Sequence, residues 1–311
     1  MSVRTKHVLS QGPVLKVLAN TAVTALRQRL SSESSDTPLP ELPTRELVKV
    51  IPPRPKELVR DYVRHVGGDP SAYRGRVPAH LFPQWGFPLQ AQSLANLPYP
   101  MFKVLNGGCR LEMNAPLPAA EPLTARAWLA DIDDNGRRAV LHQVVATGTD
   151  AAPDAVVAHM YAIVPLGGGD KNDAPRSKDA ARKKDKARVP ADALELARWR
   201  LRLDAGLDFA KLTGDFNPVH WVTPYARMFG FRNRILHGFS TMARAIEGLN
   251  RNLFSGSANA LSVFDCQFTR PLVLPAKVGL YVHDGKAFVG DAPGGPAYLV
   301  ASYKTHPQYS A

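Results

Sequence analysis

The chain has few of the residues that build metal, redox and membrane sites. Its 311 residues include only two cysteines, Cys109 and Cys266, and neither lies in a C-x-x-C pair or a His/Cys cluster. The sequence therefore indicates no metal or dithiol motif, and both cysteines lie in apolar, strand-like runs that favour buried, reduced thiols. Because no uninterrupted apolar run approaches the roughly 20 residues of a membrane helix, we predict no membrane span.

Acidic residues are absent from the first 32 positions, which contain five Lys/Arg. This composition is typical of an amphipathic organelle-targeting segment, and it is equally compatible with an ordinary helix from about Pro13 to Leu30. We favour a docked helix within an N-terminal extension, residues 1–41, and a cytoplasmic protein. A mitochondrial location is the alternative if the segment is a targeting signal.

The formal net charge is +12, and part of it is concentrated in one segment. Residues 167–190 carry eight Lys/Arg and four Asp/Glu, begin with three glycines and lack periodic apolar residues. This pattern predicts a solvated linker. The excess charge favours an anionic ligand such as the phosphates of coenzyme A or an acidic carrier protein, and only weakly a nucleic acid. An ordinary solubilising surface charge is the alternative.

On either side of the linker, residues 42–166 and 191–311 show the same order of features: a short helix, a polar loop, and then four strands joined in part by a tight Asn-Gly or Asp-Gly hairpin. This order predicts an α+β fold in which one helix is wrapped by an antiparallel sheet, twice. The expected helices are 58–66, 207–212 and 238–253. The expected strands are 108–114, 124–131, 139–147 and 156–164 in the first half, and 260–269, 276–283, 287–290 and 298–305 in the second.

The second half contains a combination of residues suited to acid–base chemistry. Asp215 and His220 lie five positions apart in a Gly/Asn/Pro loop, and Gly238 follows at the start of an apolar helix. A carboxylate and an imidazole that hold one water can deprotonate it and protonate a carbon. A free N–H at a helix N-terminus can stabilise the negative charge on a thioester oxygen. The pattern indicates addition or removal of water beside a thioester carbonyl, and either Asp215 or His220 could be the base.

Three further residues are secondary candidates. Asn217 is expected to shape the loop through local backbone hydrogen bonds, with direct substrate contact as the alternative. His237 precedes the long helix, where a lone histidine is more often structural. Ser240 lies in the first helical turn, where its hydroxyl could reach a ligand or be exposed to solvent.

The first half lacks this combination. Aligning the two short helices places Gly68 at the position of Asp215 and Tyr73 at that of His220. Five prolines between positions 78 and 100 fall where the long helix should run, and an interior proline costs about 3 kcal/mol. We therefore expect the first half to form a wall without catalytic groups, and its broken helix to leave a groove for an elongated apolar ligand.

These residues resemble the hydratase-2 motif of the MaoC-like (R)-specific enoyl-CoA hydratases, and the two-part layout is similar to the double-hotdog mycobacterial (3R)-hydroxyacyl-thioester dehydratases. The likeness rests on Leu207-x-Phe209-Ala210-x-Leu212-x-Gly214-Asp215-x-Asn217-Pro218-x-His220, Phe229-Gly230-Phe231 and Ile235-Leu236-His237-Gly238, and on Pro271–Val282. One departure is Phe239, where the family often has Met.

The resemblance implies a double-hotdog fold and reversible hydration of trans-2-enoyl thioesters to (3R)-hydroxyacyl thioesters in fatty-acid metabolism. It implies no metal or redox cofactor, with Asp215, His220 and the Gly238 amide as the catalytic groups. Members with an incomplete first helix tend to accept longer acyl chains. Two fused hotdogs already form a pseudo-dimer, so a monomer and a homodimer are both open, as are acyl length, direction, and CoA against carrier protein.

Two other functions are compatible with the sequence. A hotdog acyl thioesterase would need a carboxylate on the long helix, where Glu247 is the only acidic residue and has no evident partner motif. A non-catalytic acyl- or polyanion-binding protein would use the basic surface instead, and its binding would survive loss of Asp215 and His220.

Overall fold

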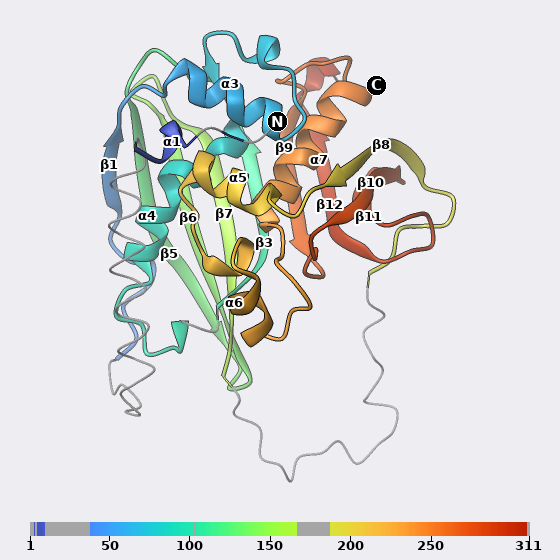
Figure 1. Cartoon of the computed structure of the whole chain (residues 1–311). Coiled ribbons are helices and arrows are strands. Elements are labelled where there is room, and N and C mark those ends of the chain that lie inside the picture. The colour runs from blue at the N-terminus through green and yellow to red at the C-terminus, as the bar shows by residue number, and fades with distance from the viewer. Residues whose placement is uncertain (1–2, 4, 10–37, 102–103, 167–186, 310–311) are drawn as a thin grey trace.

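The computed structural model describes residues 3, 5–9, 38–101, 104–166 and 187–309 (Figure 1). The predicted helix 13–30 and most of the predicted linker lie outside these ranges. Among the described residues, no helix is long and apolar enough to cross a membrane. The α+β architecture predicted from the sequence is confirmed: an antiparallel sheet of ten strands curls around a few helices.

The first half of the sheet is built from long strands that alternate between buried and partly exposed residues. In spatial order it contains β1 (Leu47–Ile51), β5 (Leu123–Asp134), β6 (Arg138–Thr149), β7 (Ala152–Pro165) and β3 (Leu105–Met113). All four predicted strands are present, and each is longer than predicted, whereas β1 was not predicted. The expected hairpin forms at Gly136, whose φ of 74° is readily adopted only by glycine.

The second half repeats this arrangement. Its strands, from the centre outward, are β9 (Leu261–Phe268), β12 (Ala297–Thr305), β11 (Lys286–Gly290), β10 (Ala276–His283) and β8 (Leu194–Leu201). The four predicted strands are again present, and the edge strand β8 is the addition. Asp284 and Gly285 both have positive φ, 46° and 68°, as expected for the two-residue hairpin between β10 and β11.

The two halves join where β3 pairs with β9. Cys109 and Cys266 lie directly opposite each other in this antiparallel pair, and both are free and buried. Burial raises the pKa of both thiols, so they remain protonated. The prediction of two buried, reduced cysteines is confirmed. Because β3 and β9 are hydrogen-bonded, the strands of the two hotdog units form one continuous sheet.

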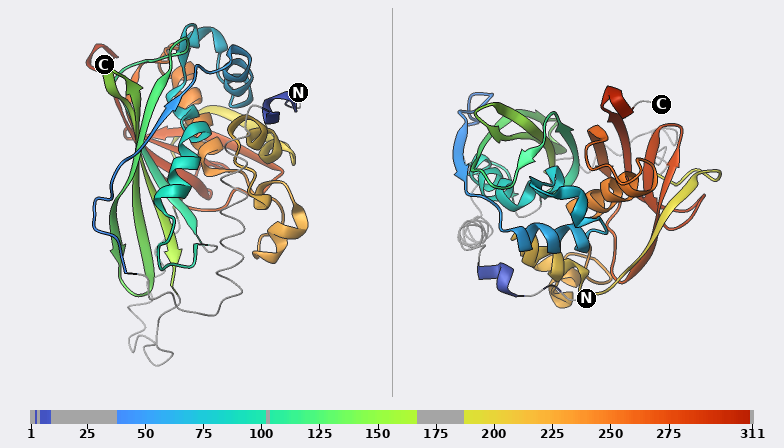
Figure 2. Two further views of the ribbon diagram at one scale, coloured as in Figure 1. Left: turned by 90° about the vertical axis from the view of Figure 1, so that its left-hand side faces the viewer. Right: turned by 90° about the horizontal axis from the view of Figure 1, so that it is seen from above.

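Each half of the sheet curls around one helix, as seen from above in Figure 2. The helix of the second half, α7 (Gly238–Asn252), matches the predicted helix, and every residue from Phe239 to Asn250 is buried. Shorter helices, α3 (Lys56–His65) and α5 (Ala205–Thr213), lead into the two polar loops. The remaining elements are α1 (Lys6–Leu9), η1 (Pro70–Tyr73), β2 (Arg76–Val77), η2 (Ala79–Leu81), β4 (Leu117–Pro118), η4 (Pro218–His220), α6 (Thr223–Met228) and η5 (Pro307–Tyr309).

The helix of the first half is shorter but present, which corrects the expectation of a broken segment. It is α4 (Pro83–Ser93), with Pro83 in its first turn and Pro88 inside it. A proline is tolerated at the start of a helix, and Pro88 removes one backbone hydrogen bond. The burial of Trp85 and Leu89, and a 3.0 Å hydrogen bond from the Trp85 indole to Thr147 Oγ1, hold the helix in place.

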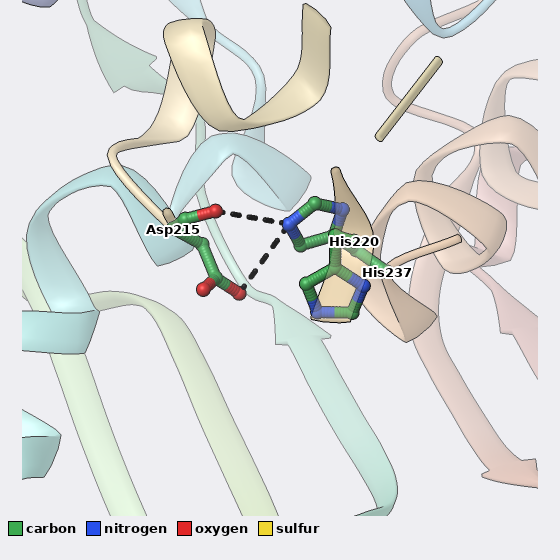
Figure 3. Close-up of side chains that lie close together, drawn as sticks. All are labelled: Asp215, His220 and His237. Carbon is green, nitrogen blue, oxygen red and sulfur yellow. Dashed lines mark hydrogen bonds and ion pairs between the residues drawn. The ribbon is translucent and has the colours of Figure 1, made fainter. Parts of the chain in front are cut away.

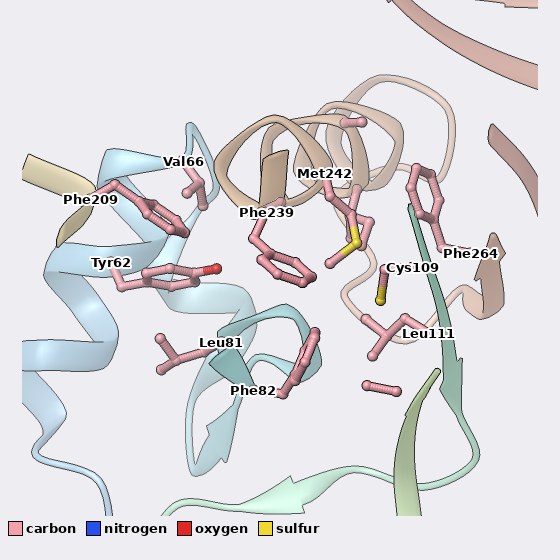
Figure 4. Packing of buried hydrophobic residues seen from close by; sticks show 14 of the residues in the cluster. Tyr62, Val66, Leu81, Phe82, Cys109, Leu111, Phe209, Phe239, Met242 and Phe264 are labelled. Atoms are coloured by element: carbon pink, nitrogen blue, oxygen red, sulfur yellow. The ribbon is translucent and has the colours of Figure 1, made fainter. Parts of the chain in front are cut away.

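Aromatic rings occupy the region where we expected a groove. Phe239, in the first turn of α7, packs edge-on against Phe82 and Phe87 of the first half, at ring-centroid distances of 5.4 and 5.5 Å. Figure 4 shows Phe82 and Phe239 within the core that joins the two halves. In this conformation Phe82 and Phe87 of the proline-rich segment pack against Phe239. An acyl chain that entered this region would have to displace these rings or pass beside them.

Candidate active site

The loop that carries Asp215 begins with a sharp change of direction after α5. Gly214 closes the helix in the left-handed region, with φ of 84°, and its N–H bonds the Ala210 carbonyl at 2.7 Å. This is the conformation for which helices favour glycine after their last turn. The chain therefore leaves the helix with the next residue, Asp215, turned toward the start of α7.

A tight turn then places His220. Asn217 caps the short helix η4 by accepting a 3.2 Å hydrogen bond from the Val219 N–H, and Pro218 sets the first φ angle. The turn lies against α5 at Gly206, where a Cβ atom would come within 2.3 Å of the His220 carbonyl oxygen. The side chain of Asn217 thus serves the backbone, and Gly206 allows η4 to approach the helix.

Three side chains converge at this loop: Asp215, His220 and His237 (Figure 3). One ligand atom from each lies within 4.8 Å of the others. The two imidazole rings stack with centroids 3.5 Å apart, and His237 Nε2 donates to the Asp215 backbone carbonyl at 3.0 Å. His237, only a secondary candidate from the sequence, is buried between the loop that carries Asp215 and α7, and it holds Asp215 in place.

The hydrogen bonds assign the protons of His220. Its Nδ1 lies 2.9 Å from the Ile235 carbonyl oxygen, which can only accept, so Nδ1 carries the hydrogen. Nε2 of the neutral ring is then a lone-pair acceptor, and no described residue forms a hydrogen bond with it. The sequence did not reveal the role of Ile235, because any residue type could provide this carbonyl.

Burial tunes the protonation states of the cluster. Removal from water raises the pKa of Asp215, opposed by attraction to His220, and lowers the pKa of His220, opposed by Asp215. The pKa of His237 falls well below its ordinary value for the same reason, helped by repulsion from His220. Both imidazoles are therefore neutral near pH 7, where His220 can accept a proton.

The spacing suits one shared water. Two hydrogen bonds of about 2.8 Å meeting at a tetrahedral oxygen join atoms about 4.6 Å apart. The carboxylate oxygen of Asp215 and a ring nitrogen of His220 are separated by no more than 4.8 Å. Because the Asp215 side chain keeps 21% of its surface exposed, solvent can reach the carboxylate.

Gly238 provides a backbone donor beside this cluster. It is the first residue of α7, whose first N–H groups have no partner within the helix. The N–H groups of Ser240 and Thr241 bond the His237 carbonyl, and among the described residues none accepts from Gly238. A Cβ atom at Gly238 would lie 2.9 Å from the Phe268 ring, so glycine allows the helix start to pack this closely.

The Ser240 side chain is fully buried, so of the two alternatives for this residue the exposed hydroxyl is wrong. No described residue forms a hydrogen bond with its Oγ.

Among the described residues, the side chains of Asp215, His220 and His237 lie close enough together to be considered as ligands of a metal ion. The geometry does not favour it: His237 Nε2 already donates to the Asp215 carbonyl, and its Nδ1 is buried without a partner. A metal would have two free ligands, one Asp215 oxygen and His220 Nε2, unless His237 turned away.

The corresponding place in the first half is filled from α7. The Glu247 carboxylate accepts hydrogen bonds from Tyr73 at 2.7 Å and His80 at 2.9 Å, and its side chain is 3% exposed. A Cβ atom at Gly68 would lie 2.4 Å from the same carboxylate. Glu247 therefore has partners that the sequence did not reveal, and the loop of the first half packs against it with no room for a side chain at position 68.

The chain is similar to a known domain family, to curated proteins and to solved structures. Residues 191–288 match the family model described as MaoC-like domain. Among curated proteins, 3-hydroxyacyl-thioester dehydratase X of Mycobacterium tuberculosis is 32% identical over 108 residues, which cover 35% of this chain and 35% of that protein. The matched region thus spans about a third of this relative's length.

Solved structures extend the likeness to both halves of the fold. HtdX of Mycobacterium tuberculosis has a TM-score of 0.64 at 20% identity, covering 84% of this chain and 100% of that chain. A conserved hypothetical protein from the same organism, described as having a double hotdog fold, has a TM-score of 0.54 at 14% identity, covering 84% and 96%. The double-hotdog fold expected from the sequence is confirmed.

Proposed function

We propose that this chain, whose residues 191–288 match the family model described as MaoC-like domain, is a hydro-lyase that interconverts (3R)-hydroxyacyl and trans-2-enoyl thioesters in fatty-acid metabolism. The single observation that carries the proposal is the convergence of Asp215 and His220 within reach of one water. The named activity of the dehydratase relative supports the same reaction class.

In the hydration direction, the Asp215 carboxylate and His220 Nε2 hold the two protons of one water. His220 Nε2 takes one proton, since its Nδ1–H is fixed on Ile235 and the charged ring that forms is attracted to Asp215. The oxygen adds to Cβ of the enoyl group, and negative charge develops on the thioester oxygen. The proton then passes from His220 to Cα, which restores the pair and completes the addition of H and OH.

The Gly238 N–H stabilises the charge on the thioester oxygen. A backbone donor at the start of a 15-residue helix is preorganised and adds the positive end of the helix dipole. The first half, residues 42–166, forms the opposite wall through Phe82 and Phe87. The substrate is a thioester of coenzyme A or of an acyl carrier protein.

Thioester hydrolysis through Glu247 is disfavoured by the packing of that carboxylate. Tyr73 and His80 both donate to Glu247 Oε1, the Gly68 backbone lies against the carboxylate, and the side chain is only 3% exposed, so an acyl group has little access to it. A nucleophile or base for hydrolysis must reach the thioester carbon. The site around Asp215 is the better candidate for chemistry.

The test is to follow the absorbance of crotonyl-CoA and of a longer trans-2-enoyl-CoA with purified protein, with free thiol measured in parallel. We expect loss of the enoyl absorbance, a (3R)-hydroxyacyl product and an intact thioester. Asp192→Asn and His283→Gln are matched controls, because this ion pair, in which Asp192 is exposed and His283 partly exposed, also places an Asp carboxylate 3.1 Å from a His ring nitrogen. Thiol release, or wild-type hydratase activity in both Asp215→Asn and His220→Gln, would overturn the proposal.

A further inference from the structure

A second basic hollow lies away from the Asp215 cluster, between α7, the edge strand β8 and the end of α3. It has a volume of ≈ 340 Å³, and its lining includes Gly67, Arg198, Trp199, Arg244 and Arg251. Trp199 lies close to two glycines. A Cβ atom at Gly67 would lie 4.0 Å from its indole nitrogen, and a Cβ atom at Gly248 would lie 3.4 Å from its ring. The hollow therefore offers three guanidinium groups and one indole edge within a small volume.

The three arginines are not equivalent. Arg198 is neutralised by Glu195, with a 2.9 Å hydrogen bond from Nε, and also donates to Tyr281. Arg251, which is exposed, donates one hydrogen bond to the Gly67 carbonyl at 2.9 Å. Arg244 is 9% exposed, its Nε is buried, and it forms neither a hydrogen bond nor an ion pair with any described residue.

The nearby carboxylate of Glu247 does not serve as the counter-ion of Arg244. It lies one turn further along α7 and accepts from Tyr73 and His80. Burial lowers the pKa of Arg244 to about 10, which still leaves the guanidinium charged at neutral pH. A buried charge without a partner is costly, and a bound anion would relieve that cost.

We propose that this hollow binds the phosphate group of a small ligand, held between Arg244 and Arg251 beside Trp199. Guanidinium groups bind phosphate oxygens through paired N–H donors, and two of them suit a multiply charged anion better than one carboxylate. A neighbouring hollow of ≈ 490 Å³ shares Arg251 and is also lined by Arg64. The two together leave room for a ligand larger than a single phosphate.

The site is tested with inorganic pyrophosphate as the probe, by calorimetric titration and tryptophan fluorescence of the full chain. We expect saturable binding to the wild type, and at least about tenfold weaker binding to Arg244→Met. Trp199→Phe should bind but lose the fluorescence change. Arg138→Met, which removes an exposed arginine of the first half, should bind as the wild type does.

If the wild type shows no saturable binding, or Arg244→Met retains full affinity, the proposal is wrong. Should Arg244→Met fail to fold, Arg251→Met carries the same expectation, because Arg251 is exposed. The binding measurement needs no turnover, so it stands or falls independently of the proposed dehydratase activity.

Two sources could supply the phosphate: the coenzyme A part of a thioester substrate, or a separate ligand. Pyrophosphate should raise KM for crotonyl-CoA but leave KM for the phosphate-free N-acetylcysteamine thioester unchanged if the substrate occupies the hollow. If a separate ligand occupies it, pyrophosphate should leave both KM values unchanged. These two arms rest on the proposed function.

Discussion

A shared water between Asp215 and His220 predicts that the two residues act as a unit. Their ligand atoms lie within 4.8 Å, so replacing either one leaves the water with a single anchor. Acid–base catalysis contributes about 10²–10⁴ in rate, or about 2.7–5.4 kcal/mol. We expect Asp215→Asn and His220→Gln each to lose a factor in this range in kcat, and the double variant to lose no more than the worse single one.

The assay is the steady-state loss of enoyl absorbance for the four proteins of the cycle, with circular dichroism as the check of folding. The residual rate of the double variant should reflect the Gly238 amide and substrate binding, which both substitutions leave in place. If the two losses multiply, giving about 10⁴–10⁸, the residues act on different atoms and the shared-water mechanism is refuted. Wild-type rates in either single variant would refute it as well.

Three further predictions concern stability and pH. Because burial raises the pKa of Asp215, its charge costs stability above the folded-state pKa; Asp215→Asn should raise Tm at pH 7, and the gain should shrink toward the ordinary Asp pKa of about 3.9. A lower Tm at pH 7 would contradict this. Gly68→Ala places a methyl 2.4 Å from the Glu247 carboxylate and should cost about 1–3 kcal/mol in denaturant unfolding, with kcat unaffected; an unchanged midpoint would exclude the contact. The acid limb of kcat/KM should fall below the ordinary His value of about 6.5, because burial lowers the pKa of His220, and a limb above that value would point to another base.

The sequence alone was enough to predict eight central strands, the helix α7 and the loop between Gly214 and His220. Alternating apolar residues have the strand period, Asp284-Gly285 requires a turn, and Gly214 is followed by residues that form caps and turns. These are local signals, because each depends on residues close together in the chain. The same local information placed Asp215, His220 and Gly238 in a common motif.

Only the tertiary structure decided the features that depend on distant residues. Within the described residues, the edge strands β1 and β8 each pair with only one neighbouring strand, β5 and β10 respectively. Helix α4 persists despite Pro88 because Trp85 and Leu89 are buried against the rest of the first half.

Contacts between the two halves were equally out of reach of local patterns. Tyr73 and Glu247 are 174 residues apart, yet Tyr73 donates a hydrogen bond to Glu247 at the place in the first half that corresponds to the Asp215 site. Arg244 is recognised as an unpaired buried charge only once the helix is packed. Burial and counter-charge are properties of the surroundings of a side chain, and for Glu247 those surroundings include Tyr73 and His80 of the other half of the chain.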